Sequence, residues 1–492
     1  MMRSVAWLAL LGAWLLLPAP MALAQSLVLN GVTIVDAQTG KLTRNQSVAI
    51  EGGKIVQIAR AGTIKPGAGA KAIAARGKYL VPGYLDMHVH SLNAADPTAS
   101  FELMLANGIT GVRQMSGSPL LLEKRRDGQL KLPADGPELL AMPGTVLTGA
   151  NAGTPDAAIA EVDRQKAMGA DFIKVINLRP DPFLAALAEA KRVGLAFDGH
   201  LQPTAAVEKA ADAGMTGIEH LGPKESVLLG CSTAETALRR AIAQKPPQAP
   251  PSPAGPGPAE RAMRATTNPT MATDPVEFDL MKRVVSTYSE TKCRALAKRF
   301  VKDGLWMTPT LIRLRTMEFG DDPAYRHNPD LRYVPAKTRA LWEEMARQFP
   351  EIVTPERRAM LKRFWALQLH LTKLLARSGV SMMTGTDAGG LGQWDVSGVA
   401  LHQEIDLLRE AGLKPLTILR MTTLNGAKFL HREDRMGSVA VGKAADLVLL
   451  DGNPLTSAAN LHRINTVIRA GTYYPKDALE RLKADAAKRV AG

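Results

Sequence analysis

Cysteine is almost absent from this 492-residue chain, which contains only Cys231 and Cys293. Two cysteines are too few for the disulfide framework that stabilises small secreted domains. They leave two alternatives open, namely one bridge across the intervening segment or two free buried thiols. In either case the chain is long enough to bury a substantial core, as two or three ordinary domains or as one large barrel with an accessory domain.

Long hydrophobic runs are also missing, apart from one at the N-terminus. Arg3 precedes an apolar run over residues 5–17, and an Ala-Leu-Ala sequence ends at Ala24. This order is typical of a cleavable secretory signal. A membrane anchor is the alternative, but the run is short for a span. We therefore expect a signal peptide over residues 1–24, no stable membrane insertion after its cleavage, and a periplasmic or secreted mature protein.

Aromatic residues are scarce, at 5% of the chain, although the net charge is +14. Such a charge could indicate a nucleic-acid partner. However, the lysines and arginines are spread along the chain and form no basic-aromatic array of the kind that stacks on bases. We therefore expect no nucleic-acid partner and interpret the charge as that of a basic exported protein that favours anionic substrates.

Short alternating runs at both ends of the chain predict β-structure. Residues 27–35 and 47–58 alternate apolar and polar positions, and Gly and Asn punctuate them as in β-hairpins. A similar pattern returns near the C-terminus, with the apolar run 447–450. We expect the two ends, residues 25–82 and 437–492, to form one small β-sandwich domain, with a helix at the C-terminus.

The middle of the chain, residues 83–436, alternates short β-type runs with helical segments, which is typical of βα units around a parallel sheet. Eight candidate strands suit a closed barrel, so we predict an α/β fold with a (β/α)8 TIM-type barrel. Its chemistry should lie at the rim formed by the C-terminal ends of the strands. The candidate strands are 79–87, 108–115, 139–146, 172–176, 194–197, 217–218, 305–307 and 380–383.

Residues that can bind metals stand at the ends of five candidate strands. The first two, His88 and His90, are two positions apart, so on a strand they project from the same face. Taken alone, each such residue has an ordinary structural explanation, for example helix capping by an aspartate. Together at one rim they predict a metal site. The others are Lys174 in the fourth strand, His200 after the fifth, His220 after the sixth and Asp387 after the eighth.

One segment interrupts the barrel pattern between the sixth and seventh strands. Residues 244–258 are too rich in proline for a helix or a central strand, so we expect a flexible loop. Because this loop is attached at the rim, it can be interpreted as a lid over the site or as a solvated insertion without a role. A second loop-rich insertion, around residues 318–335, is a candidate for substrate contacts.

The order of these residues resembles that of a known family. The chain is similar to the metal-dependent amidohydrolase superfamily, and within it to the two-metal branch of prolidase-like dipeptidases and ochratoxin-type amidases. The resemblance covers nearly the whole mature chain. It depends on His88-Val89-His90, Lys174, Gly199-His200, the stretch 213–220 ending in His220, Thr384-Gly385-Thr386-Asp387, and the β-type segments 437–439 and 442–446.

The resemblance implies two divalent metal ions and a role for each ligand. One ion would be held by His88, His90 and Asp387, and the other by His200 and His220. Lys174 would bridge them as a carbamate, formed when its neutral amine takes up carbon dioxide, and burial near cations lowers the pKa of a lysine and supplies that neutral amine. A bridging hydroxide would attack the substrate carbonyl, with Asp387 as the catalytic proton shuttle. The ligand set suits zinc, although manganese, iron or cobalt could occupy it.

The chain departs from the family pattern in two places. Arg113-Gln114-Met115 stands where relatives often carry an Arg-Asp pair, which leaves open whether a charged contact forms there. Asp198 stands two residues before His200, where relatives often have another histidine, and on a strand it would share that face and could orient a ligand. Neither departure removes a predicted metal ligand.

We predict an exported metal-dependent amidohydrolase that cleaves an amide bond in a small molecule, either a dipeptide or an N-acyl amino acid. One alternative is a one-metal deaminase or cyclic-amide hydrolase, which does not need the bridging lysine that Lys174 offers. Another is a catalytically silent metal-binding barrel, whose expected sign is the loss of a ligand. The exact substrate and the existence of a homo-oligomer stay open.

If residues 1–24 are a cleavable signal, the mature protein begins at Gln25. N-terminal sequencing of the protein recovered from the envelope or medium of its native host checks this expectation. An intact Met1 terminus in the cytoplasm would contradict it.

Overall fold

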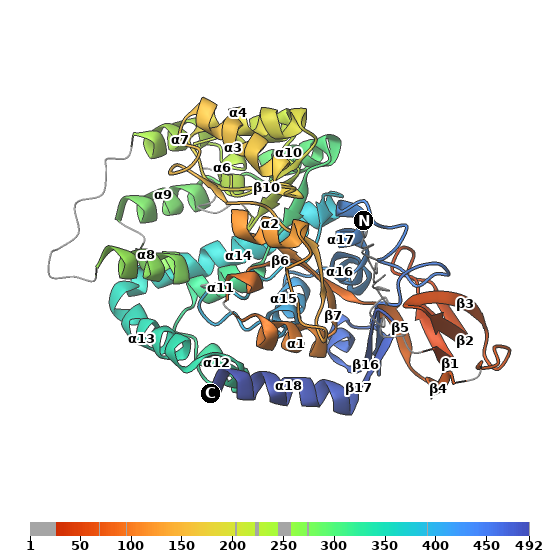
Figure 1. The fold of residues 1–492 in the computed structure, drawn as a ribbon. Helices are drawn as coiled ribbons and strands as arrows, with labels where there is room; N and C mark the ends of the chain where they lie inside the picture. The colour runs from red at the N-terminus through yellow and green to blue at the C-terminus, as the bar shows by residue number, and fades with distance from the viewer. Residues whose placement is uncertain are drawn as a thin grey trace, which may run out of the picture.

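The computed structural model describes residues 26–67, 69–94, 96–201, 204–221, 226–244, 257–272, 275–390 and 392–491. The predicted signal peptide and residues 245–256 of the proline-rich run lie outside these ranges. The described chain contains a barrel surrounded by helices and a sheet at one side of it (Figure 1). None of its helices is both long enough and apolar enough to cross a membrane.

Both chain ends build one eight-stranded sheet. Strands β5 and β15 join the two halves by antiparallel pairing, with Leu447 opposite Pro82. Alternate residues such as Leu27 and Leu29 pack with Leu447 in a common apolar core, as the alternating sequence predicts. The ends therefore fold together, but as one continuous sheet, and the predicted two-sheet sandwich is not confirmed. The strands are β1 (Leu27–Val35), β2 (Leu42–Glu51), β3 (Lys54–Arg60), β4 (Lys71–Ala74), β5 (Tyr79–Pro82), β15 (Leu447–Leu450), β16 (Ile464–Arg469) and β17 (Thr472–Pro475).

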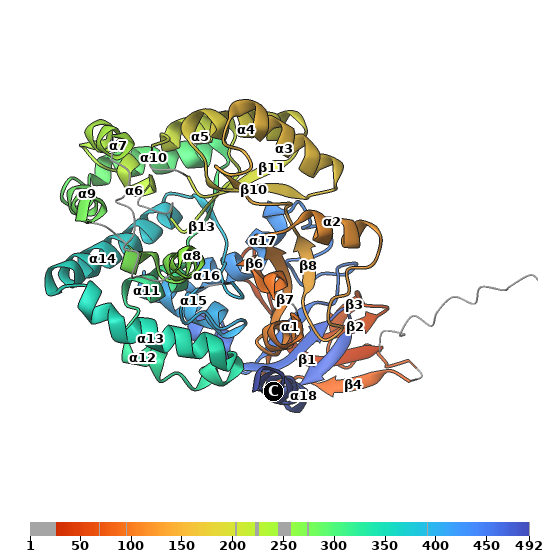
Figure 2. The ribbon, with the colours of Figure 1, turned by 60° about the vertical axis from the view of Figure 1, so that its left-hand side comes forward.

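The barrel strands are parallel and form two adjoining sheets, one of three strands and one of six. Hydrogen bonds connect the sheets at both edges, from Met87 N to Thr384 O at 3.0 Å and from Asp171 N to Met142 O at 3.1 Å. Helices surround the strands (Figure 2). The strands are β6 (Tyr84–Val89), β7 (Ile109–Gln114) and β8 (Glu138–Ala141), then β9 (Leu147–Thr148), β10 (Phe172–Asn177), β11 (Ala196–Gly199), β12 (Gly217–Glu219), β13 (Trp306–Thr308) and β14 (Ser381–Met382).

The eight predicted strands all overlap strands of the structure. One of them is divided into two strands, and the structure has one strand that was not predicted. The first candidate, 79–87, is two strands that meet at Gly83 and belong to different sheets. A side chain at Gly83 would lie 2.0 Å from Thr110 Oγ1, so only glycine allows this close passage from the end sheet into the barrel. The strand that was not predicted is β9, whose two residues are too few for a visible alternation.

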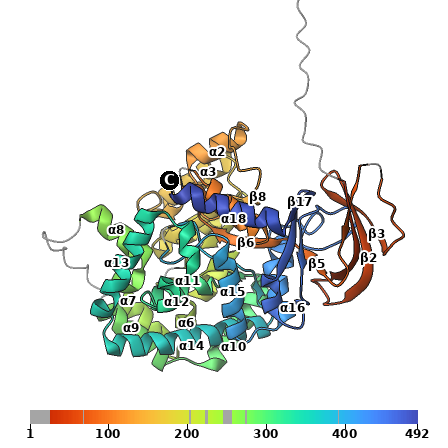
Figure 3. The same cartoon turned by 90° about the horizontal axis from the view of Figure 1, so that it is seen from below.

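Helices follow the barrel strands, as the βα pattern predicts. Several begin with proline at the first turn, where its missing N–H costs no hydrogen bond. The last helix, α18, runs from β17 along the barrel (Figure 3) and pairs Arg489 with Glu102 of α1. The main covering helices are α1 (Thr98–Ala106), α2 (Pro119–Arg126), α3 (Pro155–Ala167), α4 (Pro180–Arg192), α5 (Val207–Ala213), α10 (Glu290–Asp303), α14 (Pro355–Arg377), α15 (Val399–Glu410), α16 (Pro415–Thr422), α17 (Leu424–Phe429) and α18 (Lys476–Ala491).

The two predicted insertions are largely helical where the structure describes them. The second, around 318–335, was expected to be loop-rich, but Asp322 and Asn328 cap short helical turns that start with proline. Asp-Pro and Asn-Pro pairs mark turns and helix starts alike, which explains the error. The helices of the first insertion are α6 (Ser226–Gly230), α7 (Glu235–Ala243), α8 (Pro258–Thr267), η3 (Pro269–Ala272) and α9 (Pro275–Ser286). Those of the second are α12 (Pro323–Arg326) and η4 (Pro329–Tyr333), which lie between α11 (Leu311–Glu318) and α13 (Ala336–Ile352).

The two cysteines form one disulfide bond, between Cys231 and Cys293. Both are fully buried. The bridge joins the end of α6 to α10 across a sequence separation of 62, and the segment it encloses includes α7, α8 and α9. Of the two alternatives that the sequence leaves open, the structure therefore has the single bridge across the first insertion.

Removing this bridge should destabilise the protein by about 2–4 kcal/mol, because the unfolded chain regains the freedom of a long closed loop. We expect the Cys231→Ala/Cys293→Ala variant to unfold at lower urea concentration than the oxidised wild type. The variant should also be insensitive to a thiol reductant that shifts the wild-type transition. Equal transitions for variant and oxidised wild type would contradict this expectation.

Candidate functional site

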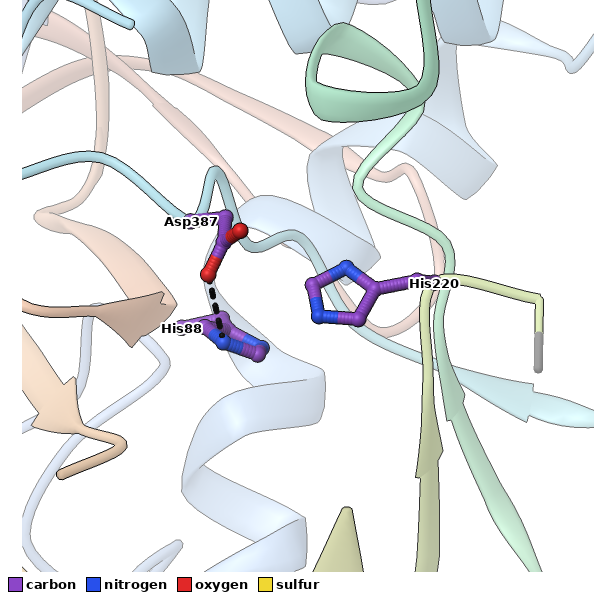
Figure 4. A group of neighbouring side chains, drawn as sticks. All are labelled: His88, His220 and Asp387. Atoms are coloured by element: carbon purple, nitrogen blue, oxygen red, sulfur yellow. Dashed lines mark ion pairs between the residues drawn. The ribbon is translucent and has the colours of Figure 1, made fainter. Parts of the chain in front are cut away.

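Three side chains from distant parts of the sequence gather at the rim of the barrel. His88 lies in β6, His220 follows β12, and Asp387 follows β14. Their nearest ligand atoms all lie within 4.8 Å of one another, and the side chains point toward one another (Figure 4). The parallel strands bring their C-terminal ends to one edge, so this grouping follows from the barrel itself.

The carboxylate of Asp387 contacts His88 in β6 and His90 directly after it. Its Oδ1 lies 2.9 Å from His88 Nε2 and 2.9 Å from His90 Nε2. The two Nε2 atoms are 3.3 Å apart, as expected for positions i and i+2 of a strand. Two imidazole nitrogens and one carboxylate oxygen are therefore directed at one small volume, which is the donor set of a divalent transition metal.

Glu219 fixes the orientation of His88, a role that was not predicted from the sequence. Its Oε2 lies 2.7 Å from His88 Nδ1. Because a carboxylate only accepts, His88 Nδ1 carries a proton, and Nε2 is the ring nitrogen that faces Asp387 Oδ1. The only available signal was an acidic residue inside a fully buried three-residue strand, directly before His220.

Lys174, His200 and His220 lie beside this group. The ring of His220 is centred 4.7 Å from that of His88 and 4.9 Å from that of His200. The Nζ of Lys174 is buried and has no hydrogen-bond partner within the described ranges. Its charge acts on the neighbouring groups and contributes to the lowered pKa of both His200 and His220. The structure therefore brings together all six residues that the sequence predicts for the site.

Burial sets the protonation of the site. It lowers the pKa of His200 and His220 well below the usual value for histidine and that of Lys174 to about 8. Burial alone would raise the pKa of Asp387, but the charges of His220 and His88 and hydrogen bonds from His88 and His90 hold it well below its usual range. Neutral imidazoles and an ionised carboxylate are the forms that bind metal.

Arg113 connects the site to a buried network of charges. It donates from Nη2 to Glu219 Oε1 at 2.6 Å and from Nη1 to Asp198 Oδ2 at 2.9 Å, and all three side chains are fully buried. The charged contact that the sequence left open near Arg113 therefore forms, with Glu219 and Asp198 as its partners. Asp198 orients Arg113, which holds Glu219, and through these two it acts on the predicted ligand His88.

In the sequence Thr384-Gly385-Thr386-Asp387, each of the last three residues has a distinct structural role. A side chain at Gly385 would lie 2.7 Å from His88 Cβ, so glycine lets the two segments approach. Thr386 donates from Oγ1 to Asp86 Oδ2 at 2.7 Å. Asp387 then adopts φ +66, a left-handed conformation that is costly for a non-glycine residue and is typical of functional sites.

Two further acids are buried below the rim. Burial raises the pKa of both Asp395 and Glu404 to about 8. Glu404 accepts a hydrogen bond from Ile312 N at 2.8 Å through Oε2, whereas its Oε1 and both oxygens of Asp395 have no hydrogen-bond partner in the described chain. At neutral pH these groups are therefore mainly protonated, in contrast to Asp387.

The sequence comparisons match parts of the chain. Residues 368–473 match the model of the amidohydrolase family. Adenine deaminase 3 of Rhizobium johnstonii is 28% identical over 214 residues, which are 39% of this chain and 34% of that protein. The dihydroorotase of Pelotomaculum thermopropionicum is 42% identical over 64 residues, 13% of this chain and 14% of that protein. The matched stretches thus span 34% or less of the length of these curated relatives.

Solved structures resemble the chain over nearly its whole length. A bottromycin amidohydrolase has a TM-score of 0.67 with 20% identity, covering 94% of this chain and 90% of that chain. A Xaa-Pro dipeptidase has a TM-score of 0.58 with 19% identity, covering 92% and 100%. The ochratoxinase of A. niger has a TM-score of 0.56 with 15% identity, covering 92% and 96%. At these identities the likeness shows the fold, which is a TIM-type barrel.

The buried Glu404 makes stability depend on pH. With a folded-state pKa of about 8 against about 4.3 when unfolded, the folded protein holds a proton that the unfolded chain loses in between. Stability from this group therefore decreases as pH rises through that range, by up to about 1.4 kcal/mol per pH unit.

We expect Glu404→Gln, which can still accept from Ile312 N and cannot ionise, to become increasingly stable relative to the wild type as pH rises from about 5 to 8. Urea unfolding of the metal-free protein measures this. Glu410→Gln on the same helix is the control, because Glu410 is exposed. Parallel pH profiles of wild type and Glu404→Gln would contradict the expected role of burial.

Proposed function

This chain contains an amidohydrolase-family domain and is a structural relative of prolidase-like dipeptidases and ochratoxinase, and from this premise we propose that it is an exported metal-dependent hydrolase cleaving an amide bond in a dipeptide or an N-acyl amino acid. The family resemblance inferred from the sequence is confirmed. The observation that carries the proposal is the meeting of six residues at one rim of the barrel, namely His88, His90, Lys174, His200, His220 and Asp387.

The donor set fits two divalent metal ions, for which zinc is the best suited. His88 Nε2, His90 Nε2 and Asp387 Oδ1 would hold one ion, since these atoms already face one another. His200 and His220 would hold the other, because burial keeps both rings neutral by lowering their pKa. Bound ions would supply an activated water and polarise the substrate carbonyl.

Lys174 would join the two halves of the site as a carbamate. In this reaction the neutral amine adds to carbon dioxide, forms an N–C bond and loses a proton to solvent. Burial lowers the pKa of Lys174 to about 8, so a substantial fraction of the amine is neutral at mildly alkaline pH. Conversion to a carbamate would also give a function to the buried Nζ of Lys174, which has no hydrogen-bond partner among the residues described.

Asp387 is the group proposed to move the proton. Its side chain is 17% exposed, whereas that of His88 is fully buried, so its carboxylate is accessible to solvent. Its low pKa keeps it ionised, and the carboxylate can accept a proton from the attacking water and deliver it to the departing amine. Glu219 keeps His88 in the orientation that binding requires.

A second candidate function is a one-metal deaminase or cyclic-amide hydrolase. The local similarity to adenine deaminase and dihydroorotase favours it. The position of Lys174 argues against it, because a single ion needs no bridging ligand. A catalytically silent barrel is less well supported, since none of the six predicted ligands is missing. Export is supported by the predicted signal and by the disulfide, because such bonds persist in oxidising compartments.

Replacing Lys174 tests the proposal. The wild type should contain two metal ions per chain and hydrolyse members of a panel of dipeptides and N-acyl amino acids. Lys174→Ala should contain fewer ions and lose at least about 100-fold in kcat/KM. Lys174→Arg should not restore activity, because a guanidinium stays protonated and cannot form a carbamate. Elemental analysis and initial rates measure both properties, with the exposed Lys166→Ala as control.

Each alternative gives a different result when cyclic amides and adenine are added to the panel. An active Lys174→Arg enzyme would contradict the carbamate. Hydrolysis of cyclic amides or deamination of adenine, with one ion per chain, would favour the one-metal enzyme. Two bound ions without turnover of any compound would indicate the silent barrel.

A further inference from the structure

We propose that Arg313 is a positioning residue for Asp387 and that the C-terminal end of the insertion helix α8 holds Arg313 in place. The proposal rests on the proposed function for the part that Asp387 plays in catalysis. It assigns a role in the site to the described part of the first insertion, which the sequence left open between a lid and a solvated segment.

The two oxygens of Asp387 have different partners. Oδ1 faces His88 Nε2 and His90 Nε2, each at 2.9 Å. Oδ2 lies 3.1 Å from Arg313 Nε, in α11. A carboxylate held at both oxygens cannot rotate about its terminal bond without breaking an ion pair. Arg313 thereby keeps Oδ1 directed at the imidazoles that are proposed to bind metal.

The remaining nitrogens of Arg313 bind the end of α8. Nη1 donates to Thr267 O at 2.9 Å and Nη2 to Thr266 O at 2.6 Å. These are the last carbonyls of the helix, which have no partner within it and carry its partial negative charge. The planar guanidinium has enough donors to bind the helix end and Asp387 together, which a lysine ammonium cannot match in geometry.

The end of α8 is itself fixed to the segment that follows Asp387. Thr267 and Asn268 are buried, at 1% and 0% exposure. Asn268 Nδ2 donates to Gln393 Oε1 at 2.8 Å, and Gln393 N donates to Thr267 O at 3.2 Å. This end of the insertion is thus packed into the rim, and a shift of α8 would move Arg313 and with it Asp387.

Two Arg313 variants test the positioning role. Arg313→Gln removes the charge, and Arg313→Lys keeps the charge but not the fork of donors. Arg315→Gln is the matched control, since Arg315 lies in the same helix, pairs with Asp322 at 2.9 Å and stacks on Phe319. We expect both Arg313 variants to lose about 10–100-fold in kcat with KM nearly unchanged, and the control to behave as the wild type.

A second readout needs no substrate. Cobalt loaded into the purified protein absorbs visible light in a way that depends on the geometry of its ligands. We expect an altered spectrum for both Arg313 variants and a wild-type spectrum for Arg315→Gln. If the wild type hydrolyses no compound of the panel, the proposed function fails, whereas the altered cobalt spectrum would still support the positioning by Arg313.

The role of α8 is tested with Asn268→Ala, which removes the side-chain hydrogen bond between the helix end and Gln393. We expect this variant to change kcat and the cobalt spectrum in the same direction as Arg313→Gln, and the double variant to be less than additive, because both changes act on one connection. Wild-type kcat and spectrum in Arg313→Gln would overturn the positioning role. Additive effects in the double variant would overturn the link to α8. Arg313→Lys retains the buried charge and keeps the test valid if Arg313→Gln does not fold.

Discussion

The contact of Asp387 Oδ1 with His88 and His90, at the end of β6, is the interaction on which the site depends. It places an ionised carboxylate against buried nitrogens, and such a group is costly to bury unless its partners are fixed. The fold fixes them on both sides. Glu219 and Arg113 hold His88 from the barrel interior, and Arg313 holds the second oxygen of Asp387 from the rim.

Much of the fold and the site could be predicted from local patterns. Strand ends are visible as alternating or apolar runs, and a parallel barrel brings those ends together, so His88, His90, His200 and His220 could be found without any structure. The order of pairing is not a local property. The sequence shows β-type runs at both ends, but it does not show that β5 and β15 are neighbours in one continuous sheet, and for this reason a sandwich was expected.

Residues that act through another residue were harder to find. Glu219 stands directly before a ligand, and Arg313 lies in a helix after the seventh barrel strand, where the charge of an arginine is unremarkable. Their roles depend on contacts with residues far away in the sequence, namely His88 and Asp387. The helical turns of the second insertion were missed because proline and asparagine mark loop turns and helix starts equally well.

The pairing of β5 with β15 also sets an order for folding. β1 and β2 lie next to each other in the sequence and can pair as soon as both have been synthesised. β5 pairs with β1 on one side, but its partner on the other side, β15, lies near the opposite end of the chain, after the whole barrel. Such long-range pairing is slow, because it requires closure of a very long loop. The edge of β5 that pairs with β15 therefore stays without a partner until the C-terminal strands have been synthesised. The end sheet can be completed only after the barrel segment between its two halves has been synthesised.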